Sequence, residues 1–598
     1  MKATDGAIIE GIGASQGIAQ GNAVLLDRRR VTFHKQHIKT KQVTSEKKRF
    51  MEAVHTSVSQ LQQLRQQVAE TFGGEHLEIL DAHELMLQDE LLISGTVNRI
   101  KEDRINAEWA LMQTLAEIKT FFNQLEDEYF RERQSDVEFV GDRIMRNLTG
   151  QQAHSLLELI ANLDEPSILV AYSLSPAETI QLRDTHIQAI CTADGTKTAH
   201  TAIVARSMEL PAVVGLRGIT DIVGSGDMLI VDGDNGRLCV RPSGPQKKFF
   251  ARTHEKVSVV RNRLNQQRQL DAVTPDRFEV QLRGNVDLIE EIDGIVSRGA
   301  SGIGLYRTEY LFLNRREIPT EEEQFVAYKQ VLQLSNPHSA TIRTLDIGGD
   351  KLEIPTDVGD QLNPFFGLRA IRYCLKEKTL FLTQLRALLR ASVFGRLRIL
   401  IPFVTDISEI WEVRELLETA GQQLRAEGYD FRDDIELGVM IEIPSAAMIA
   451  DILARHVDFF SVGTNDLIQY ILAISRDTTE IDYLYHPLHP AVLRVLRMVS
   501  DAAHREGICL SMCGEMAGDP LYTAVLLGLR FHELSMSARS IPVVREIIQR
   551  TRLKDARILV DSLFHHNTYQ EVEKEVWNHM ALHFPDLEPI LKSSLNTE

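Results

Sequence analysis

From residue 275 onward, the sequence alternates short apolar, β-rich runs with longer stretches of helical pattern. The eight runs are FEVQLRGNV, GIGLYRTE, TIRTLDIGG, RLRILIPFV, ELGVMIEIPS, FFSVGTNDL, ICLSMCGE and ELSMSARSI. Stretches such as EEEQFVAYKQVLQLS and SEIWEVRELLETAGQQLRAEG separate most of them. Eight strand–helix repeats within about 300 residues are typical of a (β/α)8 barrel. We therefore predict a C-terminal TIM-type barrel over residues 275–598.

The part of the chain before the barrel predicts a small α/β domain that is interrupted by helices. Glycine-punctuated apolar runs near the N-terminus, and strand-like runs such as PSILVAY and DMLIVDG, predict one discontinuous domain over residues 1–32 and 151–244. Residues 33–150 have apolar positions three and four residues apart and few glycines or prolines, which predicts an inserted helical bundle. The charged, helical pattern of residues 245–274 predicts a linker helix. The fold class is thus multidomain α/β.

Composition and charge argue against several classes of function. The 598 residues carry a formal net charge of -18 with no evident cluster of Lys and Arg, and binding nucleic acid requires such clusters. The acidic charge favours a basic protein partner. No apolar segment approaches the roughly 20 residues that span a bilayer, and the N-terminus lacks a secretory pattern, so we expect a cytoplasmic protein without membrane insertion. The only close cysteine pair, Cys509 and Cys513, does not complete a zinc site.

Polar side chains follow the predicted barrel strands at their C-terminal ends, where barrel enzymes place their working groups. Taken alone, each one is more often a solvated loop residue or a member of a structural ion pair, but together they form one rim. Several arginines facing one cavity suit an anionic substrate, because guanidinium groups bind carboxylate and phosphate in bidentate fashion. The candidate substrate-binding arginines are Arg307, Arg343, Arg369 and Arg476.

Two carboxylates and a thiol at the same strand ends indicate further chemistry. Glu442 and Asp466 come from neighbouring strands and suit Mg²⁺, a hard ion that takes few protein oxygens. Asn465 lies beside them in the sequence. Cys513 is either a small buried apolar residue or, if the substrate leaves as an enolate, a thiol that donates a proton to it.

A histidine opens a helical pattern in the stretch DGTKTAHTAIVARS. His200 falls in the first turn of the helix TAIVARSMEL, and helix N-termini favour phosphate through their free N–H groups and the macrodipole. A phosphorylated His200 would be stabilised there, with Lys197, Thr198 and Thr201 as further donors. Taken alone, the same residue is better explained as a member of the capping region.

These motifs together resemble those of the enzyme I family of the bacterial phosphoenolpyruvate-dependent phosphotransferase system. The resemblance covers nearly the whole chain. It is carried by GIGASQGIAQGNAVLL, EDEYFRERQSDVEFVGDRIMRNLTG, TAHTAIVARSMELPAVVG, GLYRTEYLF, PTEEEQF, TLDIGGDK, NPFFGLRAIR, SVGTNDLIQY and SMCGEMAGD. An ordered set of this size makes a chance similarity very improbable.

The resemblance implies a phosphohistidine mechanism in which the barrel binds phosphoenolpyruvate and Mg²⁺ and releases pyruvate. The phosphoryl group is then expected to pass from the swivelling α/β domain to the carrier protein HPr, which docks on the helical domain, and the barrel is expected to form a homodimer. By resemblance, the metal ligands, substrate binders, proton donor and phosphorylated residue are Glu442, Asp466, Arg307, Arg343, Arg476, Asn465, Cys513 and His200. Thr179 matches a threonine that orients the histidine ring, and Arg206 is retained beside it.

Differences from the family pattern leave alternatives open. The common GGRTSHTSIMARS motif here has Thr196, Lys197, Ala199 and Ala202 in place of glycine, arginine, serine and serine. The Lys197 ammonium replaces the planar guanidinium of an arginine, and Ala199 lacks the hydroxyl of a serine beside the histidine. The rate of phosphoryl transfer is therefore expected to differ. One alternative is a paralogue that serves a nitrogen-type HPr in a regulatory branch. A dikinase would need a nucleotide-binding loop, which we do not find before residue 150, and a purely regulatory protein would not need the charged barrel residues.

Overall fold

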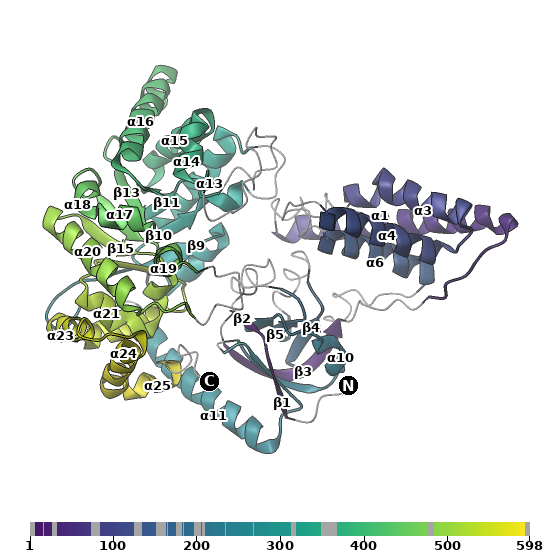
Figure 1. The fold of residues 1–598 in the computed structure, drawn as a ribbon, viewed down its shortest axis with the longest axis horizontal. Helices are drawn as coiled ribbons and strands as arrows, with labels where there is room; N and C mark the ends of the chain where they lie inside the picture. Colours follow the sequence, from purple (N-terminus) through teal and green to yellow (C-terminus); the bar gives the residue numbers. More distant parts are fainter. Residues whose placement is uncertain are drawn as a thin grey trace. The chain divides into compact units, whose positions relative to one another are not determined.

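The computed structural model describes two compact units, residues 1–254 and 255–598. Figure 1 shows the elements within each unit. Among the described helices, none combines the length and the apolar character that crossing a membrane would require. The described residues are 6–15, 17–26, 33–72, 84–124, 134–150, 163, 165–174, 182, 185–195, 205, 208, 210–233, 235–266, 268, 270–312, 318–347, 367–474 and 484–591.

The first unit contains an eight-stranded sheet with the order β1-β8-β7-β3-β4-β5-β6-β2. Strand β3 lies between β7, with which it is antiparallel, and β4, with which it is parallel, so the N-terminal segment completes a sheet made by residues more than 140 positions later. Buried aliphatic side chains on both faces form two small cores. The strands are β1 (Ala7–Glu10), β2 (Ile12–Ser15), β3 (Ile18–Leu26), β4 (Ser167–Ala171), β5 (Ile187–Thr192), β6 (Ala212–Val214), β7 (Met228–Asp232) and β8 (Arg237–Val240), with the short helix α10 (Ile219–Ile222).

The same unit contains the predicted helical bundle, which has a core of its own. Its helices are α1 (Val43–Phe72), α3 (Glu90–Glu102), α4 (Ala107–Gln124) and α6 (Gln134–Thr149), with a 3-10 turn at Thr40–Gln42. Phe50, Leu87 and Leu111 are fully buried between them. The side chain of Asp89 accepts a hydrogen bond from the Leu91 N–H and thereby caps α3, as short polar side chains do at helix starts.

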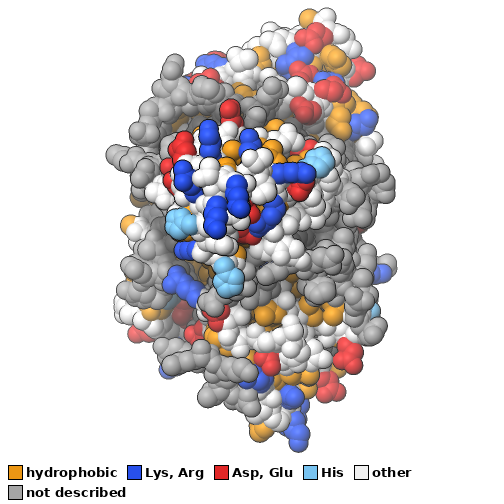
Figure 2. Space-filling model, turned by 90° about the vertical axis from the view of Figure 1, so that its right-hand side faces the viewer, with side chains coloured by type: hydrophobic (Ala, Val, Ile, Leu, Met, Phe, Trp, Pro, Cys, Tyr) orange, Lys and Arg blue, Asp and Glu red, His pale blue; other side chains and the backbone are white. Residues whose placement is uncertain are grey.

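Lysine and arginine side chains gather at one end of this bundle (Figure 2). The bridge between His37 and Ile105 brings two segments together there, which lie more than 60 residues apart in the sequence. The expectation that Lys and Arg are not clustered is therefore wrong for this face, because folding joins cations that the sequence separates. The exposed cations are Lys35, Lys39, Lys41, Lys47, Lys48, Lys101 and Arg104.

The second unit is built on a closed barrel of eight parallel strands, as predicted. Each of the eight β-rich runs of the sequence overlaps one strand. Every strand from β10 to β16 is mostly buried, because helices cover the outside and side chains fill the inside. The strands are β9 (Gln281–Val286), β10 (Ile303–Arg307), β11 (Ser339–Arg343), β12 (Arg396–Ile401), β13 (Glu436–Ile441), β14 (Phe459–Val462), β15 (Cys509–Met512) and β16 (Glu533–Met536).

Helices surround the barrel and begin with the capping signals that the sequence contains. Thr320 and Glu323 form a reciprocal capping box before α13, and Asp406 and Glu409 form another before α16. Helix α11 (Gly244–Gln266) begins one residue before the predicted linker and ends within it, and it includes the boundary between the two units. The helices of the barrel unit are α12 (Ile292–Ser297), α13 (Glu321–Ser335), α14 (Ile371–Lys376), α15 (Lys378–Ala391), α16 (Ile407–Glu427), α17 (Pro444–Met448), α18 (Ala450–Leu453), α19 (Thr464–Leu472), α20 (Pro490–Glu506), α21 (Thr523–Gly528), α22 (Ile541–Arg550), α23 (Leu553–Leu563), α24 (Tyr569–His583) and α25 (Glu588–Leu591).

A buried ion cluster closes the amino end of the barrel. The Glu533 carboxylate pairs with Arg283 at 3.0 Å and with Arg398 at 2.8 Å, and all three side chains are buried. The Arg398 guanidinium also lies 3.9 Å from the centre of the Phe459 ring. Burial opposes ionisation of Glu533, but the two arginines outweigh it and hold its pKa below the usual range. The cluster therefore ties strands β9, β12 and β16 together by charge.

We predict that Glu533→Gln destabilises the barrel by about 3–5 kcal/mol, because it removes the buried counter-charge that Arg283 and Arg398 share. Urea unfolding of the full chain at pH 7, followed by circular dichroism, would measure the loss. Because the folded pKa of Glu533 is lowered, its contribution is present above the unfolded pKa and is lost as pH falls through the folded one. The difference between variant and parent should therefore shrink on acidification, and an equal difference at pH 7 and pH 3 would contradict this.

Candidate functional site

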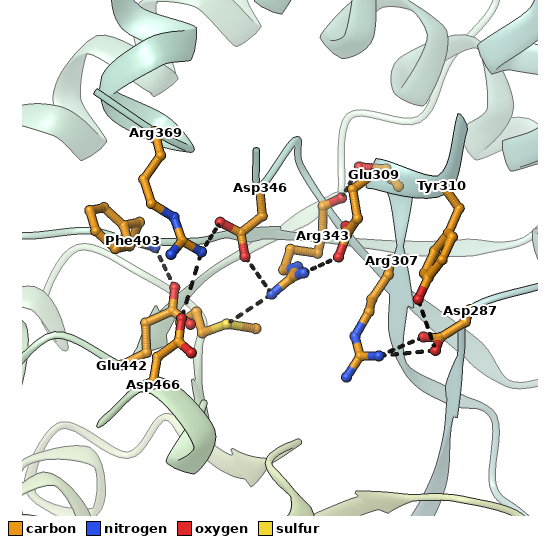
Figure 3. A network of polar contacts seen from close by, with 12 residues as sticks. Asp287, Arg307, Glu309, Tyr310, Arg343, Asp346, Arg369, Phe403, Glu442 and Asp466 are labelled. Carbon is orange, nitrogen blue, oxygen red and sulfur yellow. Dashed lines mark hydrogen bonds and ion pairs between the residues drawn. The ribbon is translucent and has the colours of Figure 1, made fainter. Parts of the chain in front are cut away.

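The C-terminal mouth of the barrel gathers the polar residues that the sequence placed at the strand ends (Figure 3). Arg307 and Arg343 are the last residues of β10 and β11. Glu442 directly follows β13, and Asp466 lies in the first turn of α19 after β14. Cys513 directly follows β15. The parallel strands bring these side chains to one end because all of them run in the same direction around the barrel.

Arg343 and Arg369 share one carboxylate. Asp346 lies 2.8 Å from Arg343 through one oxygen and 2.9 Å from Arg369 through the other. Arg343 also forms an ion pair with Glu309 on its other side. The Asp346 carboxylate is buried, which would raise its pKa, but Arg343 and Arg369 lower the pKa below its usual value. Two cations are therefore held at a fixed spacing in a largely dry site.

Arg307 is held by a second carboxylate. Both oxygens of Asp287 accept from one Arg307 nitrogen, at 2.8 and 3.0 Å, and the Tyr310 hydroxyl lies 3.4 Å from the same group. Glu291 in turn accepts from the backbone N–H of Asp287. Burial and, next, the neighbouring Asp287 raise the pKa of Glu291 to about 7. Asp287 and Glu309 are not among the residues predicted from the sequence, although each closely follows the end of a strand, which is the signal that identified the other residues.

Glu442 lies at the centre of an excess of negative charge. Its side chain is 2% exposed, and one of its oxygens accepts from the Phe403 N–H at 2.6 Å. Burial and the nearby Asp346 and Asp466 raise the pKa of Glu442 well above its usual value, although Arg343 and Arg369 act in the opposite direction. Asp466 is itself 3.6 Å from Arg369.

These carboxylates fit a divalent metal ion. A cation beside Glu442 and Asp466 would offset the repulsion that raises the Glu442 pKa, and oxygen ligands are those that Mg²⁺ prefers. Within the described residues, no cluster of three or more His, Cys, Asp and Glu side chains is arranged to hold a metal. Two protein carboxylates with the remaining positions left to substrate and water agree with Mg²⁺ better than with a closed protein cage.

Cys513 is buried beside the arginines and keeps its proton at neutral pH. Its thiol is 3.7 Å from the Val462 carbonyl oxygen. Burial raises the pKa of Cys513, while the Ser461 hydroxyl and Arg343 lower it by less. The backbone position is also fixed, because the Asn285 side chain donates to the Cys513 carbonyl at 3.0 Å. A protonated thiol with a fixed position is suited to proton donation.

Asn465 takes part through the neighbouring loop, since its side-chain oxygen accepts from the Glu515 N–H at 2.9 Å. The structure thus brings Arg307, Arg343, Arg369, Glu442, Asp466, Asn465 and Cys513 to the same end of the barrel. The remaining predicted site residues lie outside the described residues and stay predictions. They are Thr179, Lys197, Thr198, His200, Arg206 and Arg476.

Three family models match successive parts of the chain. Residues 261–553 match the phosphoenolpyruvate-binding domain of phosphoenolpyruvate-utilising enzymes, residues 10–133 match their N-terminal domain, and residues 163–236 match their mobile domain. The barrel mouth described above lies within the first of these matches.

Curated relatives resemble the chain over almost its full length. A phosphoenolpyruvate-protein phosphotransferase of Haemophilus influenzae is 40% identical over 567 residues, which is 95% of this chain and 98% of that protein. One of Staphylococcus aureus is 40% identical over 573 residues, covering 96% and 99%. Among solved structures, a solution structure of an Enzyme I (nEIt) protein is 33% identical, and the match covers 42% of this chain and 99% of that chain, with a TM-score of 0.35.

We predict that Cys513 reacts slowly with iodoacetamide in the folded protein, because a raised pKa leaves less thiolate at pH 8 than a free cysteine has. Mass spectrometry of the Cys513 peptide would follow the alkylation rate between pH 7 and pH 10, with glutathione as reference. The rate should still rise above pH 9, where that of a free thiol levels off. A plateau below pH 8.5 would show a stabilised thiolate and would remove the basis for proton donation.

Proposed function

The chain belongs to the phosphoenolpyruvate-protein phosphotransferase family, and from that membership we propose that it transfers a phosphoryl group from phosphoenolpyruvate to its own His200 and then to a histidine of an HPr-type carrier. The chain is therefore a phosphotransferase. The observation that carries the proposal is the mouth of the barrel, where Arg307, Arg343 and Arg369 lie beside Glu442 and Asp466. That combination suits a substrate with both a phosphate and a carboxylate.

The arginines are proposed to bind the substrate and to neutralise the charge that is transferred. Phosphoryl transfer depends chiefly on alignment and on electrostatic stabilisation of the transferred oxygens. Arg343 and Arg369 already have fixed positions because Asp346 holds both. They need little reorganisation when substrate binds, which is the source of the electrostatic advantage. Arg476 is proposed to complete the set.

Glu442 and Asp466 are the proposed ligands of Mg²⁺. When bound, the ion would supply positive charge to the substrate phosphate and offset the local excess of carboxylates. The two side chains are well placed to act together, since they follow adjacent strands β13 and β14. Asn465 precedes Asp466 and orients the loop that carries Cys513 and Glu515.

The reaction can then be written with every bond assigned. An imidazole nitrogen of His200 attacks phosphorus, and the bond between phosphorus and the enolate oxygen breaks. The enolate of pyruvate keeps that electron pair, and Cys513 donates its thiol proton to the methylene carbon, which completes pyruvate. Solvent later returns a proton to the thiolate. Thr179, Lys197, Thr198 and Arg206 are proposed to orient and support His200.

The domain organisation suits a carried phosphoryl group. We assign residues 1–32 and 151–244 to a swivelling domain that bears His200, and residues 33–150 to the domain that binds HPr. The linker at 245–274 would permit the swivel, and the barrel at 275–598 would bind phosphoenolpyruvate and form a homodimer. Such rigid-body motion about a linker is a common device of multidomain enzymes. The whole process is proposed to take place in the cytoplasm.

We predict that His200→Ala abolishes labelling of the protein by ³²P-phosphoenolpyruvate in the presence of Mg²⁺, because the proposed mechanism makes His200 the acceptor of the phosphoryl group. Gel autoradiography at neutral pH would measure it. A matched control is His186→Ala, which removes an exposed histidine of the same domain and should leave labelling unchanged. Undiminished labelling of His200→Ala would refute the assignment of the phosphorylated residue.

A further inference from the structure

Phe403 has an unusual backbone at the mouth of the barrel. It lies two residues after the end of β12, is 2% exposed, and has a φ of 61°. This left-handed conformation is unfavourable for a residue with a Cβ atom and for a bulky side chain in particular. Such residues persist where surrounding contacts determine them, and they occur preferentially at functional sites.

The left-handed backbone aims the Phe403 N–H at the Glu442 carboxylate, to which it donates at 2.6 Å. On the other oxygen, a Cβ added at Gly463 would lie 3.0 Å from Glu442 Oε2, so the backbone there approaches closely. The carboxylate is thus confined from both sides. One oxygen is committed to the Phe403 amide, and the other faces the loop that leads to Asp466.

The Phe403 ring contacts the substrate side of the same site. The Arg369 guanidinium lies 4.7 Å from the ring centre, and the Arg372 guanidinium lies 5.2 Å from it. Both distances are within the range of cation–π attraction, which is stronger in desolvated sites. Tyr470 meets the ring edge-on at 6.2 Å, and this tyrosine lies one turn after Asp466 on α19.

We propose that Phe403 is a positioning residue that fixes Arg369 for the substrate through its ring and Glu442 for the metal ion through its amide. The inference rests on the proposed function of this site, since it assigns a purpose to Phe403 within it. One rigid residue then ties the anion-binding half of the site to the cation-binding half. A change in the ring should affect phosphoenolpyruvate binding, whereas the amide remains in any substituted residue except proline.

The first experiment compares variants that distinguish the effect of the aromatic face of Phe403 from the effect of its side-chain volume. Phe403→Leu keeps the N–H and most of the volume but lacks the aromatic face, and Phe403→Tyr keeps that face. We expect Phe403→Leu to raise KM for phosphoenolpyruvate about tenfold, with kcat changed less than twofold, because cation–π attraction holds Arg369 alike in the ground and transition states. Phe403→Tyr should restore KM to within about threefold of the parent.

Mn²⁺ binding provides a measurement that does not depend on activity. Electron paramagnetic resonance of free Mn²⁺, titrated with protein lacking substrate, should give the same affinity for Phe403→Leu as for the parent. Phe403→Pro removes the N–H and cannot adopt the left-handed φ, so it should weaken Mn²⁺ binding severalfold. Equal Mn²⁺ affinities for the proline variant and the parent would overturn the assignment of the amide.

A double-mutant cycle with Arg369→Gln tests the ring directly. If the ring acts through Arg369, adding Phe403→Leu to Arg369→Gln should raise KM no further. Additive effects, or a KM of Phe403→Leu within twofold of the parent, would reduce Phe403 to a structural filler. Phe531→Leu, in a buried site near the opposite end of the barrel, controls for loss of core packing. A parent protein that neither binds phosphoenolpyruvate nor labels His200 would instead overturn the proposed function.

Discussion

Asp346 holds two arginines at once, and the charge balance of the barrel mouth depends on that contact. In a buried site, an arginine or carboxylate without a partner is costly, so each ion must be matched. Glu309 extends the pairing on one side and Asp466 on the other. Burial and the neighbouring Asp346 and Asp466 still raise the pKa of Glu442, against the opposing effect of Arg343 and Arg369. The proposed divalent cation would offset the charge of these carboxylates.

The two ends of the barrel differ in how completely their buried charges are neutralised. At the amino end, Glu533 lies between Arg283 and Arg398, and the arginines lower its pKa. At the mouth, Glu442 is also buried, and its pKa is raised because burial, together with Asp346 and Asp466, outweighs the arginines. The first arrangement is closed and structural. The second keeps an excess of carboxylate charge around Glu442, which the proposed metal ion would offset.

Much of this organisation was predictable because a parallel barrel converts sequence order into position. Eight β-rich runs predicted eight strands, and the residues that end them predicted Arg307, Arg343, Glu442 and Cys513 as members of one site. Asp287 was not predicted as a site residue, although it follows β9 by one residue. Its role becomes clear only in the structure, where it pairs with Arg307. Pairing across strands depends on side-chain reach, which periodicity does not encode.

The left-handed backbone conformation of Phe403 also could not be predicted from the sequence. Nothing in the run RLRILIPFV distinguishes Phe403 from an ordinary apolar residue, and glycine or asparagine is the usual sign of a left-handed position. Its conformation follows from three-dimensional contacts: the amide meets Glu442, and the ring meets Arg369. The cluster of lysines and arginines at one end of the helical bundle was not predicted for a related reason, since the bridge between His37 and Ile105 joins two segments that are distant in the sequence. Features that depend on a local sequence pattern could therefore be predicted from the sequence. Features that arise where distant segments come together could be recognised only in the three-dimensional structure.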